Sequence, residues 1–228
     1  MLNYIFDLYG TLVDIHTDEQ SARFKKRFAK YFKTIDGNTD FFKEYFSLCA
    51  DLAKLGGETY EFDLLQVFEK LAGADKAQEA AERFRTMSTR YIKLYKGVAA
   101  FLSALKARGA KLYILSNAQS CFTVSELERL DLSKYFDGVE LSSDFGAKKP
   151  DASFFKHMLS KYSLNVDESI YVGNDICADL HGARDVNMRS AYVLSNLSPK
   201  SDTLDEASKT AVFACSSHKI LFEYLLSI

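Results

Sequence analysis

The sequence predicts an α/β protein in which helices cover both faces of a parallel sheet and an all-helical segment is inserted after the first strand. Two observations support this prediction. From residue 98 onward, short apolar runs rich in β-branched and aromatic residues alternate with amphipathic helical patterns. Between the first apolar run and residue 94, we find only helical periodicity. Strands connected through helices form right-handed crossovers, so the strands should lie parallel in one sheet.

The first strand is predicted at residues 3–6, and the helical insertion follows it. Thr17 is a plausible helix N-cap, and Phe24, Phe28 and Phe32 recur at helical spacing. Breaks between the helices are expected at residues 36–38 and 55–60. No strand is predicted within this insertion.

The later elements follow in regular alternation. Strands are predicted at residues 111–117, 139–143, 169–175, 189–194 and 211–215. Helices are predicted at residues 98–108, 125–130, 152–162, 180–186 and 218–226. The chain therefore divides into an α/β core, formed by residues 1–14 and 93–228, and a helical cap of residues 15–92.

Composition limits the possible partners. The 228 residues are 47% hydrophobic and 26% charged, which is typical of a globular protein with a sizeable core. The net charge is −2 with Lys and Arg spread along the chain, so we expect no nucleic-acid or membrane partner. A small-molecule substrate is predicted, with the protein a monomer or a homodimer. No membrane-length apolar run or room for a signal peptide is found, so the cytoplasm is the expected location.

Three polar residues follow or end predicted strands. Asp7, Ser116 and Asp175 each stand at the carboxyl end of an apolar run. In an open parallel sheet, ligands bind beyond these ends, so the three side chains should meet at one edge. A carboxylate can attack phosphorus and form an ester that water then hydrolyses. Because both the nucleophile and a phosphate ester are anionic, a cation is needed between them, and two carboxylates plus substrate phosphate favour Mg²⁺.

Four motifs carry a family resemblance. In order along the chain they are FDLYGTLVD at residues 6–14, ILSNA at 114–118, AKKPD at 147–151 and VGNDICAD at 172–179. Together they resemble the haloacid dehalogenase (HAD) superfamily, in the group with a helical cap after the first motif. The resemblance implies a Rossmann-like core, Asp7 as a covalent nucleophile, and Mg²⁺ held by Asp7, Asp175 and the backbone carbonyl of Tyr9.

The same resemblance assigns roles to the other motif residues. Ser116 and Lys149 would hold the transferring phosphoryl group; Lys149 rather than Lys148 is chosen because it directly precedes the proline. Thr11 and Asn117 would supply further donors to the substrate.

Two residues of the fourth motif would act on the site through its other residues or its charge. Asp179 would orient Lys149 or the waters of the metal. Asn174 stands at a position that a further acid could occupy, and its neutral amide slightly lowers the negative charge of the site.

Tyr9 departs from the phosphatase pattern, which usually has an aspartate at this place as the general acid and base. A tyrosine there is typical of dehalogenases, whose halide leaving group needs no proton. Asp175 and Asp179 argue the other way, because crowded carboxylates are unfavourable without a metal. We therefore expect a magnesium-dependent phosphatase acting on a small phosphorylated metabolite. The alternatives are a metal-independent 2-haloacid dehalogenase and a weakly active phosphoryl-binding protein of this fold.

The cap should select the substrate. Glu58, Tyr60, Glu61 and Asp63 lie at a predicted break, where a loop can reach the cleft. Arg23 and Arg27 could meet an anionic group, although a solvated helix face is the simpler interpretation. The four cysteines lie far apart without CxxC spacing, so free thiols are expected.

Overall fold

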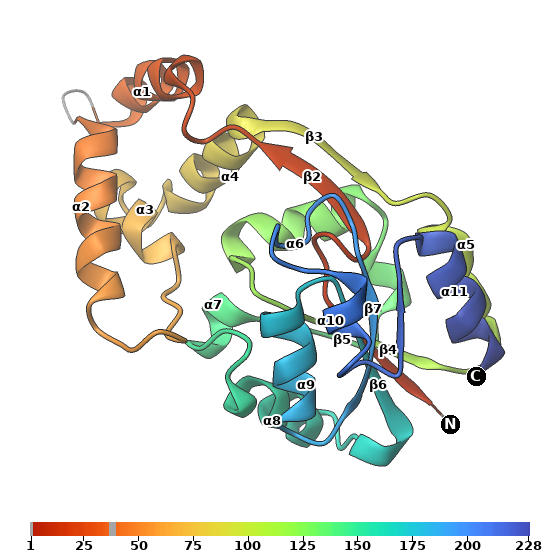
Figure 1. Cartoon of the computed structure of the whole chain (residues 1–228). Helices are drawn as coiled ribbons and strands as arrows, with labels where there is room; N and C mark the ends of the chain where they lie inside the picture. The colour runs from red at the N-terminus through yellow and green to blue at the C-terminus, as the bar shows by residue number, and fades with distance from the viewer. Residues whose placement is uncertain (1, 37–39) are drawn as a thin grey trace.

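Figure 1 shows the computed structural model of the chain, which describes residues 2–36 and 40–228. Six strands form one sheet in the order β5-β4-β1-β6-β7-β8, and every neighbouring pair is parallel. The strands of this sheet are β1 (Asn3–Phe6), β4 (Lys111–Ser116), β5 (Gly138–Leu141), β6 (Ser169–Gly173), β7 (Arg189–Val193) and β8 (Phe213–Cys215). The predicted α/β fold with a parallel sheet is confirmed.

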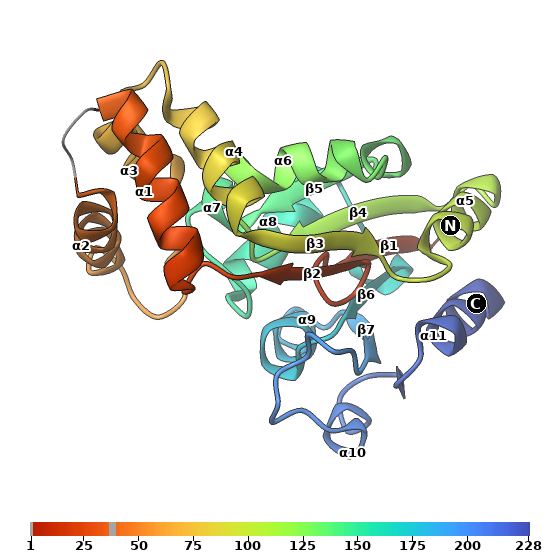
Figure 2. The ribbon, with the colours of Figure 1, turned by 90° about the horizontal axis from the view of Figure 1, so that it is seen from above.

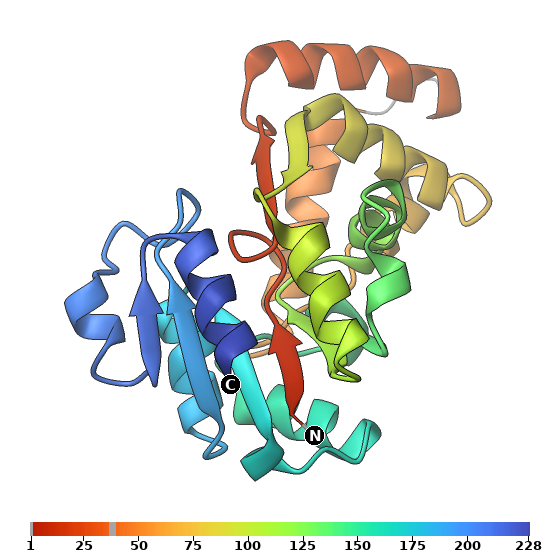
Figure 3. The ribbon, with the colours of Figure 1, turned by 90° about the vertical axis from the view of Figure 1, so that its right-hand side faces the viewer.

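Helices cover the two faces of the sheet. Helices α5 (Val98–Ala107) and α11 (His218–Ser227) pack on one face, where they lie side by side in front of the strands in Figure 3. Helices α8 (Ala152–Lys161) and α9 (Gly182–Arg184) pack on the other face. Because successive side chains of a strand point to opposite faces, Tyr4 and Phe6 of β1 reach the first layer and Ile5 reaches the second.

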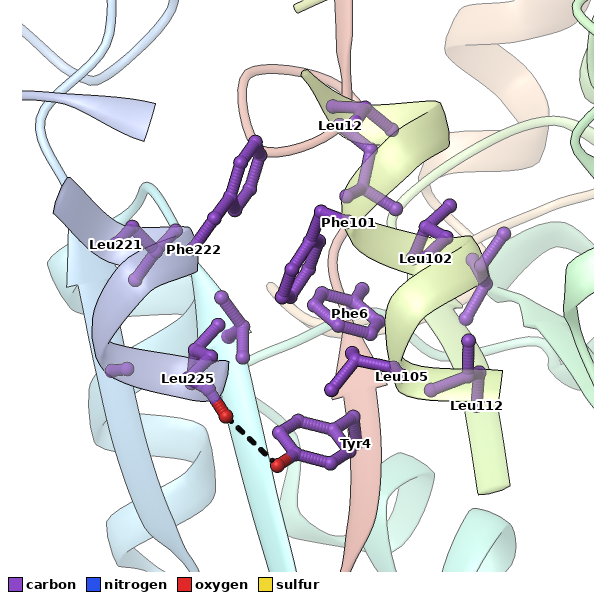
Figure 4. Close-up of a cluster of buried hydrophobic side chains, with 14 of the residues drawn as sticks. Tyr4, Phe6, Leu12, Phe101, Leu102, Leu105, Leu112, Leu221, Phe222 and Leu225 are labelled. Atoms are coloured by element: carbon purple, nitrogen blue, oxygen red, sulfur yellow. Dashed lines mark hydrogen bonds between the residues drawn. The ribbon is translucent and has the colours of Figure 1, made fainter. Parts of the chain in front are cut away.

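The core between β1, α5 and α11 is built from interlocking aromatic rings (Figure 4). Phe6 meets Phe101 edge-on with ring centroids 6.0 Å apart, and Phe101 stacks on Phe222 at 4.3 Å. The Tyr4 hydroxyl donates to the Leu225 carbonyl over 3.0 Å, which satisfies the only polar atom that this ring brings into the core. These contacts fix α11, at the end of the chain, against the first strand.

The helical insertion has a hydrophobic cluster of its own. Its helices are α1 (Ala22–Asp36), α2 (Phe41–Ala53), α3 (Leu65–Ala72) and α4 (Ala77–Ser88), which lie to one side of the sheet in Figure 1. Phe24, Phe28 and Phe32 are all buried in this cluster, as their spacing predicts. The break predicted at residues 55–60 is confirmed, because α2 ends before it and α3 begins after it. The break at residues 36–38 falls largely outside the described residues.

The prediction that the insertion contains no strand is wrong. Strands β2 (Val13–Thr17) and β3 (Thr89–Leu94) pair antiparallel and form a two-stranded ribbon that joins the insertion to the sheet (Figure 2). Thr17 therefore ends a strand and is not an N-cap. The ribbon pairs only with itself and is half exposed, so its sequence lacks the continuous apolar run of a central strand. The predicted limits of core and cap, at residues 14/15 and 92/93, fall inside this ribbon.

Smaller differences concern the helices of the core. Helix α6 (Ser120–Arg129) begins five residues before its prediction at residue 125, and the helix predicted at 180–186 is a π-helical turn, Ile176–His181, followed by α9. The remaining short elements are α7 (Ser142–Phe145), α10 (Leu204–Ala207) and the 3-10 turns Ser133–Tyr135 and Val166–Glu168. Within residues 2–36 and 40–228, no helix is long and apolar enough to cross a membrane.

Candidate active site

Three strand ends bring the predicted polar residues together. Asp7 directly follows β1 and its N–H donates to the Val172 carbonyl of β6 over 2.9 Å. Ser116 ends β4, and its hydroxyl donates to Asp7 Oδ1 over 3.2 Å. Asp175 follows β6 and lines the same cavity. This arrangement follows directly from a parallel sheet, whose carboxyl ends share one edge.

Lys149 lies at the centre of the site and is only 3% exposed. Its ammonium donates to Asp7 Oδ1 over 2.8 Å, to Asp179 Oδ1 over 2.7 Å and to the Tyr171 hydroxyl over 2.6 Å. Asn117 fixes the backbone of Lys149, because its Oδ1 accepts from the Lys149 N–H over 2.8 Å and its Nδ2 donates to the Lys149 carbonyl over 3.0 Å. The Asn117 amide thus fixes the backbone of Lys149, and the residue also lines the cavity.

Burial and charge pairing set the protonation of these groups. Burial raises the pKa of Asp7 to about 6, even though Lys149 is in contact with it. The ammonium offsets this only in part because it is shared with Asp179, whose own charge raises the pKa of Asp7 further. Burial opposes the charge of Lys149, but Asp179 and Asp7 outweigh it, so the pKa of Lys149 is raised. Lys149 is therefore a permanent cation, whereas Asp7 is ionised only above weakly acidic pH.

The other oxygen of Asp7 has different neighbours. The Thr11 hydroxyl donates to Asp7 Oδ2 over 3.4 Å. With the Asn174 amide turned so that its nitrogen faces acceptors, this nitrogen lies 3.2 Å from Thr11 Oγ1, 3.3 Å from Asp7 Oδ2 and 3.1 Å from the Tyr9 carbonyl. Gly10 has φ +92°, and a Cβ at this position would lie 2.2 Å from the nearest atom of the Asn174 amide group, so only glycine allows this close approach. Asp7 Oδ2 thus has two neutral neighbours, a hydroxyl and an amide.

Asp179 and Asp175 are held by the turn that follows β6. Asp179 Oδ2 accepts from the backbone N–H groups of Asn174 and Asp175 over 2.9 and 3.0 Å, while its Oδ1 receives Lys149. Asp175 Oδ1 accepts from the Ala178 N–H over 2.8 Å. Burial raises the pKa of Asp175, which is half-buried at the edge of the cavity. Asp179 therefore contacts Lys149, one of the two partners expected for it, and Asp175 keeps an oxygen for another partner.

The Tyr9 hydroxyl is occupied away from Asp7. It hydrogen-bonds to the Glu126 carboxylate and to Thr123 Oγ1, the latter over 3.0 Å. Burial, followed by the nearby charge of Glu126, raises the pKa of Tyr9 well above its usual value. This hydroxyl is therefore neither a base nor a ready proton donor at neutral pH.

The cavity formed by these groups measures about 160 Å³ and is mainly polar. It is lined by Asp7, Tyr9, Ser116, Asn117, Lys149, Asn174, Asp175, Ala178, Asp179 and Leu197. Within the described part of the chain, no group of three or more His, Cys, Asp or Glu side chains is arranged to hold a metal ion. A site for Mg²⁺ here would instead need two carboxylates and a backbone carbonyl.

The loop between α2 and α3 lies against this side of the core. Gln119 Nε2 donates to Glu61 Oε1 over 2.9 Å and to the Phe62 carbonyl over 3.0 Å. Tyr60 forms a β-bridge with Ala147, two residues before Lys149. The loop predicted to reach the cleft therefore contacts the segment that carries Lys149. Arg23 and Arg27 do not reach the site and line a separate hollow beside the start of α1.

The comparisons with known proteins agree with this geometry. The sequence profile of haloacid dehalogenase-like hydrolases matches residues 4–193. The chain belongs to this family. A curated relative, the phosphoserine phosphatase of Thermus thermophilus, is 31% identical over 150 residues, which cover 65% of this chain and 60% of that protein.

Two solved HAD structures share the whole fold. The 2-haloacid dehalogenase of Pseudomonas syringae pv. Tomato has a TM-score of 0.68 at 20% identity and covers 100% of this chain and 99% of its own. A HAD phosphatase from Thermococcus onnurineus has a TM-score of 0.65 at 20% identity, covering 99% and 98%. The fold of this HAD chain is thus compatible with either chemistry, and its own residues must decide between them.

Sequence reasoning missed three side chains that shape this HAD site. Tyr171 contacts Lys149 and Asp179 from within β6, where its pattern suggests only a core aromatic residue. Gln119 follows the second motif and contacts the insertion. Glu126 had a usable signal: it follows Phe122 by four residues, which places it on the buried face of α6.

Proposed function

We propose that the protein is a magnesium-dependent phosphatase that hydrolyses a small phosphorylated metabolite through an aspartyl-phosphate on Asp7. The proposal depends on one observation, which is that the two oxygens of the Asp7 carboxylate have different neighbours. Its Oδ1 accepts from the charged Lys149 and from Ser116, whereas the neighbours of its Oδ2, the Thr11 hydroxyl and the Asn174 amide, are neutral. The phosphatase name of the curated relative supports this choice of substrate class.

The residues around Oδ2 fit a hard divalent cation. Asp7 Oδ2 and the Tyr9 carbonyl lie beside the Asn174 amide nitrogen, and Asp7 Oδ2 also accepts from the Thr11 hydroxyl, so this side offers oxygen ligands and has only neutral donors beside them. Mg²⁺ prefers oxygen ligands and is usually bound through one or two carboxylates together with substrate phosphate. Asp7, Asp175 and the Tyr9 carbonyl would hold it, and bound Mg²⁺ would offset the repulsion between Asp7 and a phosphate dianion.

The reaction has two steps, formation and hydrolysis of the aspartyl-phosphate, and protein residues assist both. Asp7 attacks phosphorus while Lys149 and Ser116 hold the phosphoryl oxygens, and the bond from phosphorus to the leaving oxygen breaks. The leaving oxygen takes its proton from water, because the Tyr9 hydroxyl is engaged by Glu126. Water next attacks phosphorus, the bond to Asp7 breaks, and inorganic phosphate leaves. Asp179 keeps Lys149 in position through both steps.

We further infer that residues 15–92 act as a cap whose loop near Glu61 contributes to substrate choice. This loop contacts the Lys149 segment through Tyr60 and Gln119. We also propose a cytoplasmic location, which agrees with four free cysteines, and a monomer or homodimer as the working form.

Metal-independent 2-haloacid dehalogenation is the second candidate, and Tyr9 favours it. A halide ion leaves without a proton, so a site without a free acid beside Asp7 suits this reaction. Asp175 speaks against it, because a further carboxylate at the same cavity as Asp7 is unfavourable without a cation. A phosphoryl-binding protein without turnover is the remaining possibility.

One experiment separates the three functions. The protein would be assayed against a panel of phosphorylated metabolites and 4-nitrophenyl phosphate with Mg²⁺ and with chelator, and against 2-chloropropionate under both conditions. We expect Mg²⁺-dependent phosphate release that D7N abolishes. Chloride release in chelator would establish the dehalogenase instead. Phosphate binding without turnover on any ester would establish the binding protein.

A further inference from the structure

A chain of buried polar contacts joins the Asp7 loop to the helical insertion. The Tyr9 hydroxyl hydrogen-bonds to Glu126 of α6, which is only 2% exposed. Glu126 in turn accepts from Arg85 of α4, with Arg85 Nε 2.7 Å from Glu126 Oε1. Arg85 also reaches Glu19, at the start of the insertion, over 3.4 Å. The three side chains thus connect the first motif, the core and the insertion.

The surroundings make this contact specific. The Arg85 guanidinium lies over the Tyr9 ring at 5.8 Å and over the Phe122 ring at 5.3 Å. Phe122 itself belongs to the hydrophobic cluster of the insertion. A carboxylate buried like Glu126 needs its partner, because an unpaired charge in such a place is costly. Seating α4 against α6 therefore fixes the position of Glu126.

Tyr9 presents its two polar ends to different partners. Its hydroxyl belongs to the contact chain, and its carbonyl lies 3.1 Å from Asn174 Nδ2, beside Asp7 Oδ2. A displaced ring would move the backbone of this short loop, and with it the carbonyl that is proposed to bind Mg²⁺.

We propose that Tyr9 is a positioning residue, held by Glu126 and Arg85, and that the seating of the insertion thereby sets the affinity of the metal site. The proposal rests on the proposed function for the identity of the metal. In this proposal, Tyr9 holds the loop in place and does not transfer a proton. It also predicts that residues of α4, remote from the metal, affect metal binding.

The test is a double-mutant cycle with two readouts. One arm is Y9F, which removes only the hydroxyl. The other is R85M/E126Q, which removes both charges together so that neither is left buried and unpaired. The third variant combines all of these changes. Binding of Mg²⁺ is measured by calorimetry, and amide hydrogen exchange is measured for the peptide that contains residues 8–12. R83M serves as the matched control, because Arg83 is an exposed residue of the same helix.

Each arm should raise the Kd for Mg²⁺ by about 3- to 10-fold, as expected for coupling through a packed network. The combined variant should bind no more weakly than the weaker of the two arms, because both interrupt one chain. Exchange in residues 8–12 should accelerate in R85M/E126Q but not in R83M. The pH profile of kcat should be the same in Y9F as in the unaltered protein.

Two results would overturn the proposal. Additive effects on Kd would show that Tyr9 and the Arg85–Glu126 pair act separately. Unchanged Kd and exchange in both arms would show that the contacts only pack the interface. Failure of the proposed function gives a different result, since the unaltered protein would then bind no Mg²⁺, while the exchange measurement would still report whether the insertion controls the Asp7 loop.

Discussion

On its Oδ1 side, Asp7 faces an ammonium and a hydroxyl, whereas on its Oδ2 side it faces a neutral hydroxyl and a neutral amide. The first side is complete within the protein, because Lys149 balances Asp7 and Asp179 over 2.8 and 2.7 Å. On the second side, the Thr11 hydroxyl and the Asn174 amide contact Asp7 Oδ2, and neither group carries a charge. Under the proposed function, the phosphoryl side is therefore built in advance, and the opposite side is where Mg²⁺ would bind.

Removing the charge of Asp7 should have the largest effect on activity, because both sides of the site depend on it. D7N keeps the size of the side chain but loses the nucleophile, and we expect phosphatase activity to fall at least about 10³-fold. The measurement is kcat on the best ester of the panel. Undiminished turnover by D7N would exclude a covalent intermediate on Asp7.

The Tyr9 residue stands where phosphatases usually have a general acid, but its hydroxyl is engaged by Glu126. We therefore expect kcat/KM for aryl phosphates to exceed that for alkyl phosphates of similar size by about 10²- to 10⁴-fold, the usual contribution of general acid catalysis. Rates would be compared across a series of esters with leaving groups of graded acidity. Equal turnover of both classes would reveal a donor other than Tyr9.

The Oδ1 side of Asp7, which includes Lys149, should contribute more to folding stability than the Oδ2 side. K149M leaves Asp7 and Asp179 buried without a cation, which should lower the free energy of unfolding by about 3–5 kcal/mol. The double variant K149M/D179N should recover part of this loss, since one of the two charges is then absent. Urea unfolding monitored by circular dichroism checks both. An unchanged stability of K149M would mean that the carboxylates are protonated in the native state.

The stability of the metal-free protein should depend on Asp7 in a pH-dependent way. The pKa of this buried carboxyl rises from 3.8 to about 6 on folding, so the native state binds the proton more tightly than the unfolded state. Stability is therefore lost as pH rises from about 4 to about 6. In chelator, D7N should match the unaltered protein at low pH and exceed it by up to about 3 kcal/mol at pH 8. A stability difference independent of pH would contradict this cause.

On the side where Mg²⁺ is proposed to bind, a substitution should have the smallest effect on activity. D175N keeps the shape of Asp175 but removes a predicted ligand, and we expect the Mg²⁺ concentration for half-maximal activity to rise about 10- to 100-fold. The matched control is D185N, an exposed carboxylate outside the cavity. An identical Mg²⁺ dependence in D175N would assign the ion to other residues.

The sequence allowed a prediction of the strand-end residues because a parallel sheet gathers all its carboxyl ends at one edge. Asp7, Ser116 and Asp175 needed no knowledge of distant contacts beyond this rule. The ribbon of β2 and β3 was not predicted, because its strands are half exposed and pair only with each other. Their local pattern therefore resembles the neighbouring helices.

Contacts between elements explain the other differences. Asn117 was expected only as a substrate donor, whereas its amide also holds the backbone of Lys149, 32 residues further along the chain. The direction of the Tyr9 hydroxyl depends on Glu126, 117 residues away. No local pattern encodes such a partner, since it follows from how α6 packs between the sheet and the insertion.

The antiparallel ribbon restricts the directions in which the insertion can move relative to the six-stranded sheet. Both covalent connections run through it, and its two strands are cross-linked from Val13–Leu94 to Thr17–Thr89. A pair of strands joined by hydrogen bonds resists shear within its plane but bends readily out of it. The two connections therefore cannot swivel independently, as two single loops would. We therefore expect any movement of the insertion relative to the sheet to be a bending of this ribbon with one dominant direction.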